Sequence, residues 1–479
     1  MIKDIKKITL MLFILLFTFS SAVIAFDSDS FYAEEEETET TIIGDIKPEI
    51  RVFDDGDLEE NLSGTLDISY PGSTHSFQLI TDFQIGAAEE IEFNELNYQY
   101  FGDKYTLLIG KHRVIWGKGD QLHVVDNLNG EDLSDFINQD YKDRQIGEEM
   151  IKINRYFRGG NANLEFVYTP DFTSNRMADD PESRLGNWVI NPFIAQSDDF
   201  TLKNIALATG QIETEVFNQV EDSIPEEDNQ IALRFTDSRG STDYGFSYYQ
   251  GYLRKPSYDL LALKTSLKQN PIDPPNNLAE IEENKNNLKK ALTAADLKYD
   301  EVDVFGFELA RVIADINSRF ELAYFRTEDT DGSNPTVRNN KIAWVIGGER
   351  DLPISSLNLN LQFTGEKILD DEQIENNVVQ TQTGSENIDL EYNQDGDYTT
   401  NRAVLKLEDS YQNEKIIPQL TWVYNLNDQD YSLEAAVDYE LKQDLVMTVS
   451  HKIFEGDEGT TFGQFENNDY SSLSLNYSF

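Results

Sequence analysis

The chain ends in Leu473-Ser-Leu-Asn-Tyr-Ser-Phe479, in which apolar and polar residues alternate up to an aromatic carboxyl terminus. A period of two is the period of a β-strand, so the apolar side chains share one face and the polar side chains the other. The last residues of most domains are poorly ordered, so an alternating pattern that continues to the final residue is unusual. The ending predicts a terminal β-strand.

This terminal segment resembles the closing strand of bacterial outer-membrane β-barrels. In that family the terminal aromatic residue belongs to the signal that the barrel-insertion machinery reads. The resemblance implies that Tyr477 and Phe479 form such a signal, and that the insertion machinery is a partner of this chain. An ordinary edge strand of a soluble sheet is the alternative, and the rest of the chain weighs against it.

The other end of the chain has the three-part order of a secretory signal peptide. Three lysines in the first seven residues precede an apolar run over 8–19, and small residues follow up to Ala25. The run is shorter than the roughly 20 residues that a membrane-spanning helix needs, which disfavours an N-terminal anchor. We expect a signal peptide over 1–25, an acidic flexible lead-in over 26–45 and one barrel domain over 46–479.

The composition is strongly acidic, with a formal net charge of −49 and no cysteine. This charge argues against nucleic acid as a partner, because it would repel phosphates. The lack of cysteine excludes an N-terminal lipoprotein anchor and disulfides. A mean hydropathy of −0.51 is compatible with a membrane barrel, because only alternate strand residues face lipid. We prefer a halophilic origin as the explanation of the acidity, since carboxylates keep a surface solvated in concentrated salt.

Alternating segments of about ten residues recur along the chain, the length that a tilted membrane strand requires. Counting back from Phe479 gives 18 segments, an even number, as a single-chain bacterial barrel requires, and 16 would also be consistent. The predicted fold is therefore all-β: a transmembrane, antiparallel, up-and-down β-barrel of 16–18 strands. The segments lie near 46–54, 62–70, 75–86, 91–101, 104–115, 149–156, 160–168, 228–238, 241–252, 302–313, 318–327, 340–350, 355–366, 398–408, 415–425, 430–441, 444–454 and 469–479.

The connections alternate between short turns and longer loops, as in barrels with periplasmic turns and outer loops. Within one outer loop, apolar residues over 277–297 recur at helical spacing, which predicts a helix that is either a solvated cap or a partner-binding element. Another outer loop is rich in acids but lacks the spacing of a calcium-binding loop, so no metal site is predicted. The predicted outer loops are 116–148, 169–227, 253–301, 367–397 and 455–468.

One segment, 107–136, has the features of a pore constriction. On the strand that opens it, Lys111 and Arg113 should face a wet lumen, because cations are costly on the lipid side, and Trp116 should lie near the outer interface. In porins an early loop folds into the barrel and pairs acids against basic wall residues. The alternative is that the cations pair with local acids and stiffen the wall. The candidate acids are Asp120, Asp126, Glu131, Asp132 and Asp135.

The same segment resembles the G-R-x-V-x-W-G…N-P-x-D motif of an uncharacterised proteobacterial outer-membrane barrel family, often encoded beside lipid-exporting pumps. Two later stretches, around Pro170 and Tyr249, are similar to further segments of that family. This chain departs from the motif at Lys111 and at Gly130-Glu131. The resemblance implies a pore or a role in transporting hydrophobic compounds. The matching residues are Gly110, Arg113, Trp116, Gly117, Asn129, Asp132, Pro170, Phe172, Arg176, Tyr249 and Gly251.

No nucleophile elbow, zinc motif or phosphate loop accompanies the four histidines, so we expect no enzymatic activity and no cofactor. The predicted function is a porin-like channel in the outer membrane of a diderm bacterium. It would pass small solutes or hydrophobic compounds passively and prefer cations. Its expected partners are outer-membrane lipid, the insertion machinery and small solutes, and homo-oligomerisation stays open. A non-transporting adhesin or envelope barrel is the main alternative, ahead of a barrel hydrolase.

Overall fold

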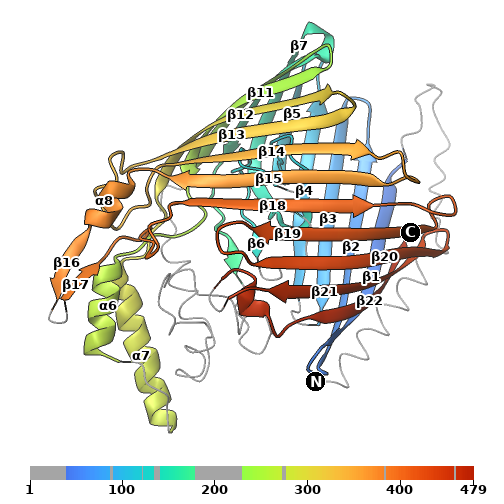
Figure 1. Ribbon diagram of the computed structural model, residues 1–479. Coiled ribbons are helices and arrows are strands. Elements are labelled where there is room, and N and C mark those ends of the chain that lie inside the picture. Colours follow the sequence, from blue (N-terminus) through green and yellow to red (C-terminus); the bar gives the residue numbers. More distant parts are fainter. Residues whose placement is uncertain are drawn as a thin grey trace. The chain divides into compact units, whose positions relative to one another are not determined.

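Eighteen antiparallel strands pair edge to edge and close on themselves in the computed structural model (Figure 1). The structure describes residues 39–86, 90–120, 122–133, 141–177, 229–271, 277–381, 384–457 and 460–479. The predicted signal peptide lies outside these residues, as does Asp135. The wall strands are β1 (Thr41–Phe53), β2 (Leu58–Pro71), β3 (His75–Ile85), β4 (Glu90–Phe101), β5 (Tyr105–His112), β7 (Glu148–Phe157), β8 (Ala162–Thr169), β10 (Gln230–Arg239), β11 (Thr242–Tyr252), β12 (Glu301–Ile313), β13 (Ile316–Thr327), β14 (Lys341–Asp351), β15 (Asn358–Ile368), β18 (Thr399–Glu408), β19 (Ile416–Asn425), β20 (Tyr431–Lys442), β21 (Leu445–Glu455) and β22 (Tyr470–Ser478).

The barrel closes where the terminal strand meets the first strand. β22 pairs with β1 in a register that sets Ser478 opposite Asp45, and beyond it Phe479 exchanges two backbone hydrogen bonds with Gly44, of 2.9 and 3.0 Å. Closure leaves no free sheet edge, so every wall strand has a partner on both sides. The prediction of a closed antiparallel barrel of 18 strands is confirmed.

The wall is apolar outside and polar inside. On β22 the side chains of Leu473, Leu475 and Tyr477 are 37–46% exposed, while Ser472 and Ser474 are buried. This distribution is the reverse of a soluble sheet, in which serines would face water and leucines the core. It is the arrangement expected when the outer face meets lipid and the inner face meets water or packed polar groups.

The strand connections at one end are short, and those at the other are mostly long. The short set includes 72–74, 240–241 and 443–444. The long set carries the remaining elements, which are β6 (Asp132–Leu133), α2 (Tyr141–Arg144), β9 (Arg176–Met177), α6 (Leu260–Gln269), α7 (Leu278–Ala295), α8 (Asp371–Asn376), β16 (Val378–Thr381), β17 (Gly384–Asn387) and the 3₁₀ turn Gly463–Phe465. The 3₁₀ turn Arg158–Gly160 belongs to the short set. We call the two ends the short-turn end and the long-loop end.

Several element boundaries differ from the predicted ones. The first strand begins at Thr41, and β5 ends at His112 instead of continuing to 115. The helix predicted over 277–297 is confirmed as α7, but α6 was missed, although Asp259 caps it by accepting a hydrogen bond from the Ala262 N–H at 2.8 Å. Among the described residues, no helix is both long and apolar enough to cross a membrane.

Candidate functional site

The connection between β5 and β7 spans 113–147, and its described residues, 113–120, 122–133 and 141–147, fold into the barrel, where Glu321 of β13 holds them on the opposite wall. We call it the infolded connection. One carboxylate oxygen of Glu321 accepts hydrogen bonds from the backbone N–H groups of Lys118 (2.6 Å) and Gly119 (2.7 Å), and the other from Val124 (2.9 Å). His123 Nδ1 lies 3.2 Å from the same carboxylate. Glu321 is fully buried, so these donors replace the water that the charge has lost.

The tip of the infolded connection reaches a second wall strand. Asp120 forms an ion pair with Arg319 of β13 and accepts a hydrogen bond from Asn360 Nδ2 of β15 at 2.7 Å. The Asp120 N–H donates to Gln362 Oε1 at 3.4 Å. The predicted acid-to-wall pairing therefore exists at Asp120, although its basic partner is Arg319 and not Lys111 or Arg113.

An apolar cluster inside the barrel covers the base of the infolded connection. Trp116 is fully buried there and donates its indole N–H to Glu165 of β8 at 2.5 Å. The Arg234 guanidinium lies 5.8 Å from the Trp116 ring centre and pairs with Glu308 at 2.6 Å. The prediction that Trp116 lies near the outer interface is therefore wrong, because β5 ends four residues earlier and strand alternation no longer sets its direction. The cluster comprises Val114, Trp116, Val125 and Leu128 with Leu108, Met150, Val167, Ala232, Tyr249, Val302, Val304, Ala323, Phe325 and Ala343 of the wall.

Asn129 joins the two ends of the infolded connection. Its side-chain oxygen accepts the Val114 N–H at 2.9 Å, and its amide donates to the Ile146 carbonyl at 2.7 Å. Gly117, another residue of the resemblance, has a φ of +115°, and a Cβ atom there would collide with Glu321 and His123. These motif residues shape the infolded connection and do not face an open channel.

Arg254, which follows β11, connects three segments at the long-loop end. Its guanidinium donates to Glu148 Oε1 at 2.6 Å and to the Leu128 carbonyl at 2.8 Å, and it also bonds the Thr173 carbonyl. It lies 4.7 Å from the ring centre of Phe172, so that motif residue packs against a cation. Tyr249, also in the motif, is buried and hydrogen-bonds Gln230, to which Arg254 donates at 3.1 Å.

The cations predicted to face the lumen pair with nearby acids of β4. Lys111 lies 3.6 Å from Glu92, and Arg113 lies 3.2 Å from Glu95. Strand alternation predicted that His112 faces lipid, but its Nδ1 lies 2.6 Å from Glu95 Oε2. His112 shares the inward-facing side of β5 with the buried Thr106 and Leu108. At these positions the basic side chains therefore pair with acids of the neighbouring strand.

The remaining candidate acids that the structure describes, Asp126, Glu131 and Asp132, have partners within the protein. Asp132 pairs with Arg176 at 3.0 Å, and the two residues form the parallel bridge of β6 and β9, so two parts of the resemblance meet here. The Glu131 carboxylate accepts a hydrogen bond from Gln145 Nε2 at 3.5 Å, and its backbone N–H donates to Asn175 Oδ1 at 2.9 Å. Asp126 is partly buried and accepts the Tyr141 hydroxyl at 2.9 Å, and desolvation raises its pKa to about 7.

A polar cavity of about 960 Å³ occupies the part of the lumen that the apolar cluster leaves open. Side chains from β1–β4 and β18–β22 line it together with the infolded connection. The two signs of charge are nearly balanced along this lining. Its basic residues are Lys47, Arg113, Arg144, Arg402, Lys406 and Lys452, and its acidic residues are Asp45, Asp82, Glu92, Asp132, Asp143, Glu434 and Asp438.

Among the described residues, two histidines contact a hydroxyl group, as the base of a hydrolase would. His75 Nδ1 lies 3.1 Å from Thr74 Oγ1. His451 Nδ1 lies 3.0 Å from Ser471 Oγ on the exposed outer face of β21 and β22. The nearby Asp469 accepts the Phe454 N–H at 2.8 Å. In the described part of the chain, no group of three or more His, Asp or Glu residues is arranged to hold a metal ion.

Sequence reasoning missed Glu321, Arg319 and Arg254. Glu321 lies in an alternating strand where a polar residue on the inner face is ordinary, and its partner is about 200 positions away. A weak signal was present for Arg254, because it directly follows an aromatic strand and stands two residues before Pro256.

Comparisons with solved structures return barrels of low sequence identity. The crystal structure of Pseudomonas aeruginosa OccD3 (OpdP) matches with 8% identity and a TM-score of 0.45, over 92% of this chain and 90% of that chain. The crystal structure of Acinetobacter baumannii OccAB3 matches with 9% identity and a TM-score of 0.46, over 92% of this chain and 99% of that chain. Escherichia coli Wzi, described as a carbohydrate-binding β-barrel involved in capsule assembly, matches with 10% identity and a TM-score of 0.46, over 92% of this chain and 84% of that chain. No curated protein matches the sequence.

A family model covers most of the chain. It matches residues 91–479, which hold the infolded connection, Glu321 and the terminal strand. The protein therefore belongs to the family described as "Protein of unknown function (DUF1302)".

Proposed function

We propose that the protein is a porin-like outer-membrane channel through which small solutes or hydrophobic compounds pass passively, with a preference for cations. The observation that carries this proposal is the polar cavity of about 960 Å³ beside the infolded connection. A purely structural barrel has no need of a charged, solvent-sized space inside its lumen. An 18-strand barrel is also wide enough to keep an aqueous path when one loop folds inward.

The cation preference rests on the excess of acids over the whole chain. The cavity lining is close to neutral, so the preference would arise from acids at the mouths and loops. The negative electrostatic potential of these acids would attract cations from a distance and would be screened by salt.

The test is conductance of the purified, folded protein in a planar lipid bilayer. We expect discrete current steps, and under a potassium chloride gradient a reversal potential of the sign that cations produce. Heat-denatured protein from the same preparation is the control. Folded protein that gives no steps would rule out the channel and leave a non-transporting adhesin or envelope barrel.

The non-transporting alternative has its own support in the extent of the internal packing. The apolar cluster and the Glu321 contacts fix the infolded connection across the lumen. Among the described residues, a hydrolase has in its favour only the hydroxyl contacts of His75 with Thr74 and of His451 with Ser471. Turnover of ester substrates in detergent that disappears in Ser471→Ala would establish that activity.

A further inference from the structure

The outer face of β10–β13 changes abruptly from aromatic to polar near the long-loop end. One row across these strands, set by the strand register, consists of Leu233, Tyr248, Phe305 and Tyr324. The ring centres of Tyr248 and Phe305 are 5.3 Å apart, and those of Phe305 and Tyr324 are 6.4 Å apart. Aromatic rows of this kind mark the interface between bilayer and water.

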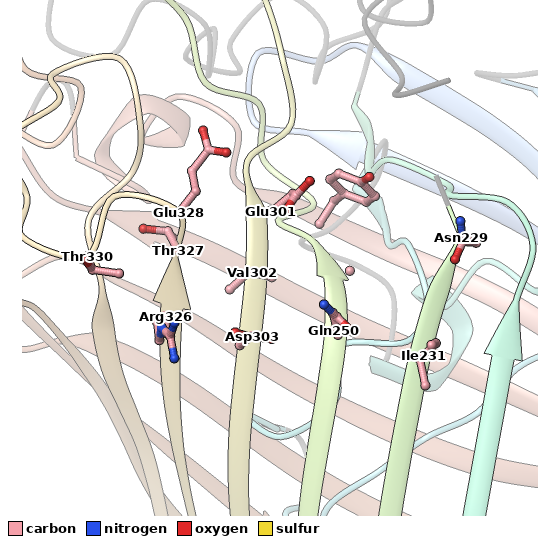
Figure 2. Close-up of a pocket in the computed structure, with 12 residues that line it drawn as sticks. Asn229, Ile231, Gln250, Glu301, Val302, Asp303, Arg326, Thr327, Glu328 and Thr330 are labelled. Atoms are coloured by element: carbon pink, nitrogen blue, oxygen red, sulfur yellow. The ribbon is translucent and has the colours of Figure 1, made fainter. Parts of the chain in front are cut away.

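In the next row toward the long-loop end, three of the four residues are polar or charged. It consists of Ile231, Gln250, Asp303 and Arg326, which lie opposite one another in the register. A pocket of about 370 Å³ opens along this row and continues to Glu301 and Glu328 at the strand ends. Figure 2 shows Arg326, Asp303 and Gln250 on neighbouring strands, with Glu301 and Glu328 above them.

The charges in this pocket are only partly neutralised by the protein. Asp303 accepts the Tyr248 hydroxyl at 2.7 Å, and Glu328 pairs with Lys298 at 2.9 Å. Arg326 and Glu301 are exposed, and neither makes an ion pair or a side-chain hydrogen bond with another residue that the structure describes. The pocket therefore presents one available cation and one available anion directly above an aromatic row.

We propose that this pocket binds the headgroup of a zwitterionic membrane lipid. The phosphodiester would lie on the Arg326 guanidinium and the ammonium on Glu301 and Asp303, while the acyl chains lie along Tyr248, Phe305 and Tyr324. Arg326 and Glu301 are one strand spacing and two residues apart, about 8 Å between backbones. A phosphate followed by a two-carbon ammonium arm bridges such a gap between long side chains.

The placement of the pocket favours a lipid over a soluble zwitterion. The polar groups sit at the edge of an outward-facing apolar surface, where a bilayer delivers headgroups at high local concentration. An anionic lipid would satisfy Arg326 but would bring its negative charge close to three carboxylates. The inference needs the barrel to lie in a bilayer, but it does not need the lumen to conduct.

The test is lipid retention by the full-length protein, measured by native mass spectrometry from detergent micelles doped with equal amounts of phosphatidylethanolamine and phosphatidylglycerol. We expect the wild type to retain phosphatidylethanolamine preferentially. Arg326→Gln removes the charge-assisted bonds to phosphate and should lower retention by on the order of tenfold. Glu301→Gln should reduce the preference over phosphatidylglycerol.

A matched control lies at the opposite end of β12, on the same outer face of the wall. Arg311 of β12 is also exposed and in phase with the outward-facing Phe305, but it lies at the short-turn end, so Arg311→Gln should retain lipid as the wild type does. A mobility shift on heating verifies that each variant is folded. Equal retention in Arg326→Gln and Arg311→Gln, or equal retention of both lipids by the wild type, would overturn the proposal.

Discussion

At the scale of single residues, Glu321 is the group on which the position of the infolded connection depends most directly. A carboxylate accepts on both oxygens, and both are occupied by N–H groups of the connection. An amide in its place has one accepting oxygen, and its NH₂ group would face another donor. The arrangement is therefore specific for a charged acceptor.

Glu321→Gln should loosen the infolded connection without unfolding the barrel. Each lost hydrogen bond to a buried charge is worth about 1.5–3 kcal/mol, so amide exchange over 117–125 should accelerate at least about tenfold. Hydrogen exchange with mass spectrometry measures this. Glu434→Gln is the control, because Glu434 also lines the lumen but pairs with Lys452 of the wall. Wild-type exchange over 117–125 in Glu321→Gln would show that the contacts do not hold the connection.

Asp126 should make the same connection sensitive to pH. Burial raises the pKa of this carboxyl from 3.8 to about 7, so the folded state binds the proton more tightly than the unfolded state. The stability of the connection should therefore fall as pH rises from about 4 to about 7 and then level off.

Amide exchange over 122–133, corrected for the intrinsic effect of pH, should be faster at pH 8 than at pH 6. Asp126→Asn keeps an acceptor for Tyr141 but removes the charge, so it should abolish the difference. Glu131→Gln in the same segment should leave the difference in place. A pH effect that persists in Asp126→Asn would place its origin in another group.

At the scale of elements, strands were predictable and contacts inside the lumen were not. Alternation in a segment such as Leu473–Phe479 is a local property and locates the strand to within a few residues. The direction of Trp116 and the pairing of Asp120 with Arg319 depend on residues far away in sequence. The prediction of an infolded acidic loop used loop length and composition, which are local properties, whereas the anchors Glu321 and Arg319 are distant in sequence.

The helical hairpin of α6 and α7 should be dispensable for the barrel. Its ends are adjacent, since the Asp259 N–H donates to the Ala295 carbonyl at 2.7 Å, and its buried residues include Leu263, Leu288 and Leu292 (Figure 1). Replacing 260–295 by a Gly-Ser link should leave the melting temperature of the barrel unchanged. Trp116→Ala provides the contrast, because removing a fully buried Trp costs about 3–5 kcal/mol. A hairpin deletion as destabilising as Trp116→Ala would mean that the hairpin supports the wall.

The terminal strand should matter for insertion as well as for closure. Phe479 bonds Gly44 through its backbone, and its ring lies where a Cβ atom on Gly44 would be. Phe479→Ser keeps the backbone bonds but removes the aromatic group that resembles an insertion signal. We expect lower abundance in the outer-membrane fraction. Leu473→Ser is the matched control on the same strand, and equal abundance of both variants would argue against a special role for the terminal aromatic.

At the scale of the whole molecule, a net charge of −49 surrounds a lumen whose lining is nearly neutral. Any preference for cations should then come from charges at the mouths, which act through solvent. The Debye length falls from about 10 Å at 0.1 M salt to about 3 Å at 1 M, so the preference should weaken steeply over that range. Charges that act within the cavity would be screened much less.

The reversal potential across a fixed tenfold gradient, measured at low and at high mean salt, separates these two origins. We expect a cation-selective potential at low salt that approaches zero at high salt. Asp120 and Asp132 are paired with Arg319 and Arg176, so neutralising them should alter the noise and size of the current steps more than the selectivity. Neutralising the exposed Asp395 and Asp397, which belong to the long-loop end, should lower the selectivity at low salt alone. A preference that is independent of salt would instead place the selective charges inside the cavity, with Asp45, Asp82 and Glu92 as the first residues to change.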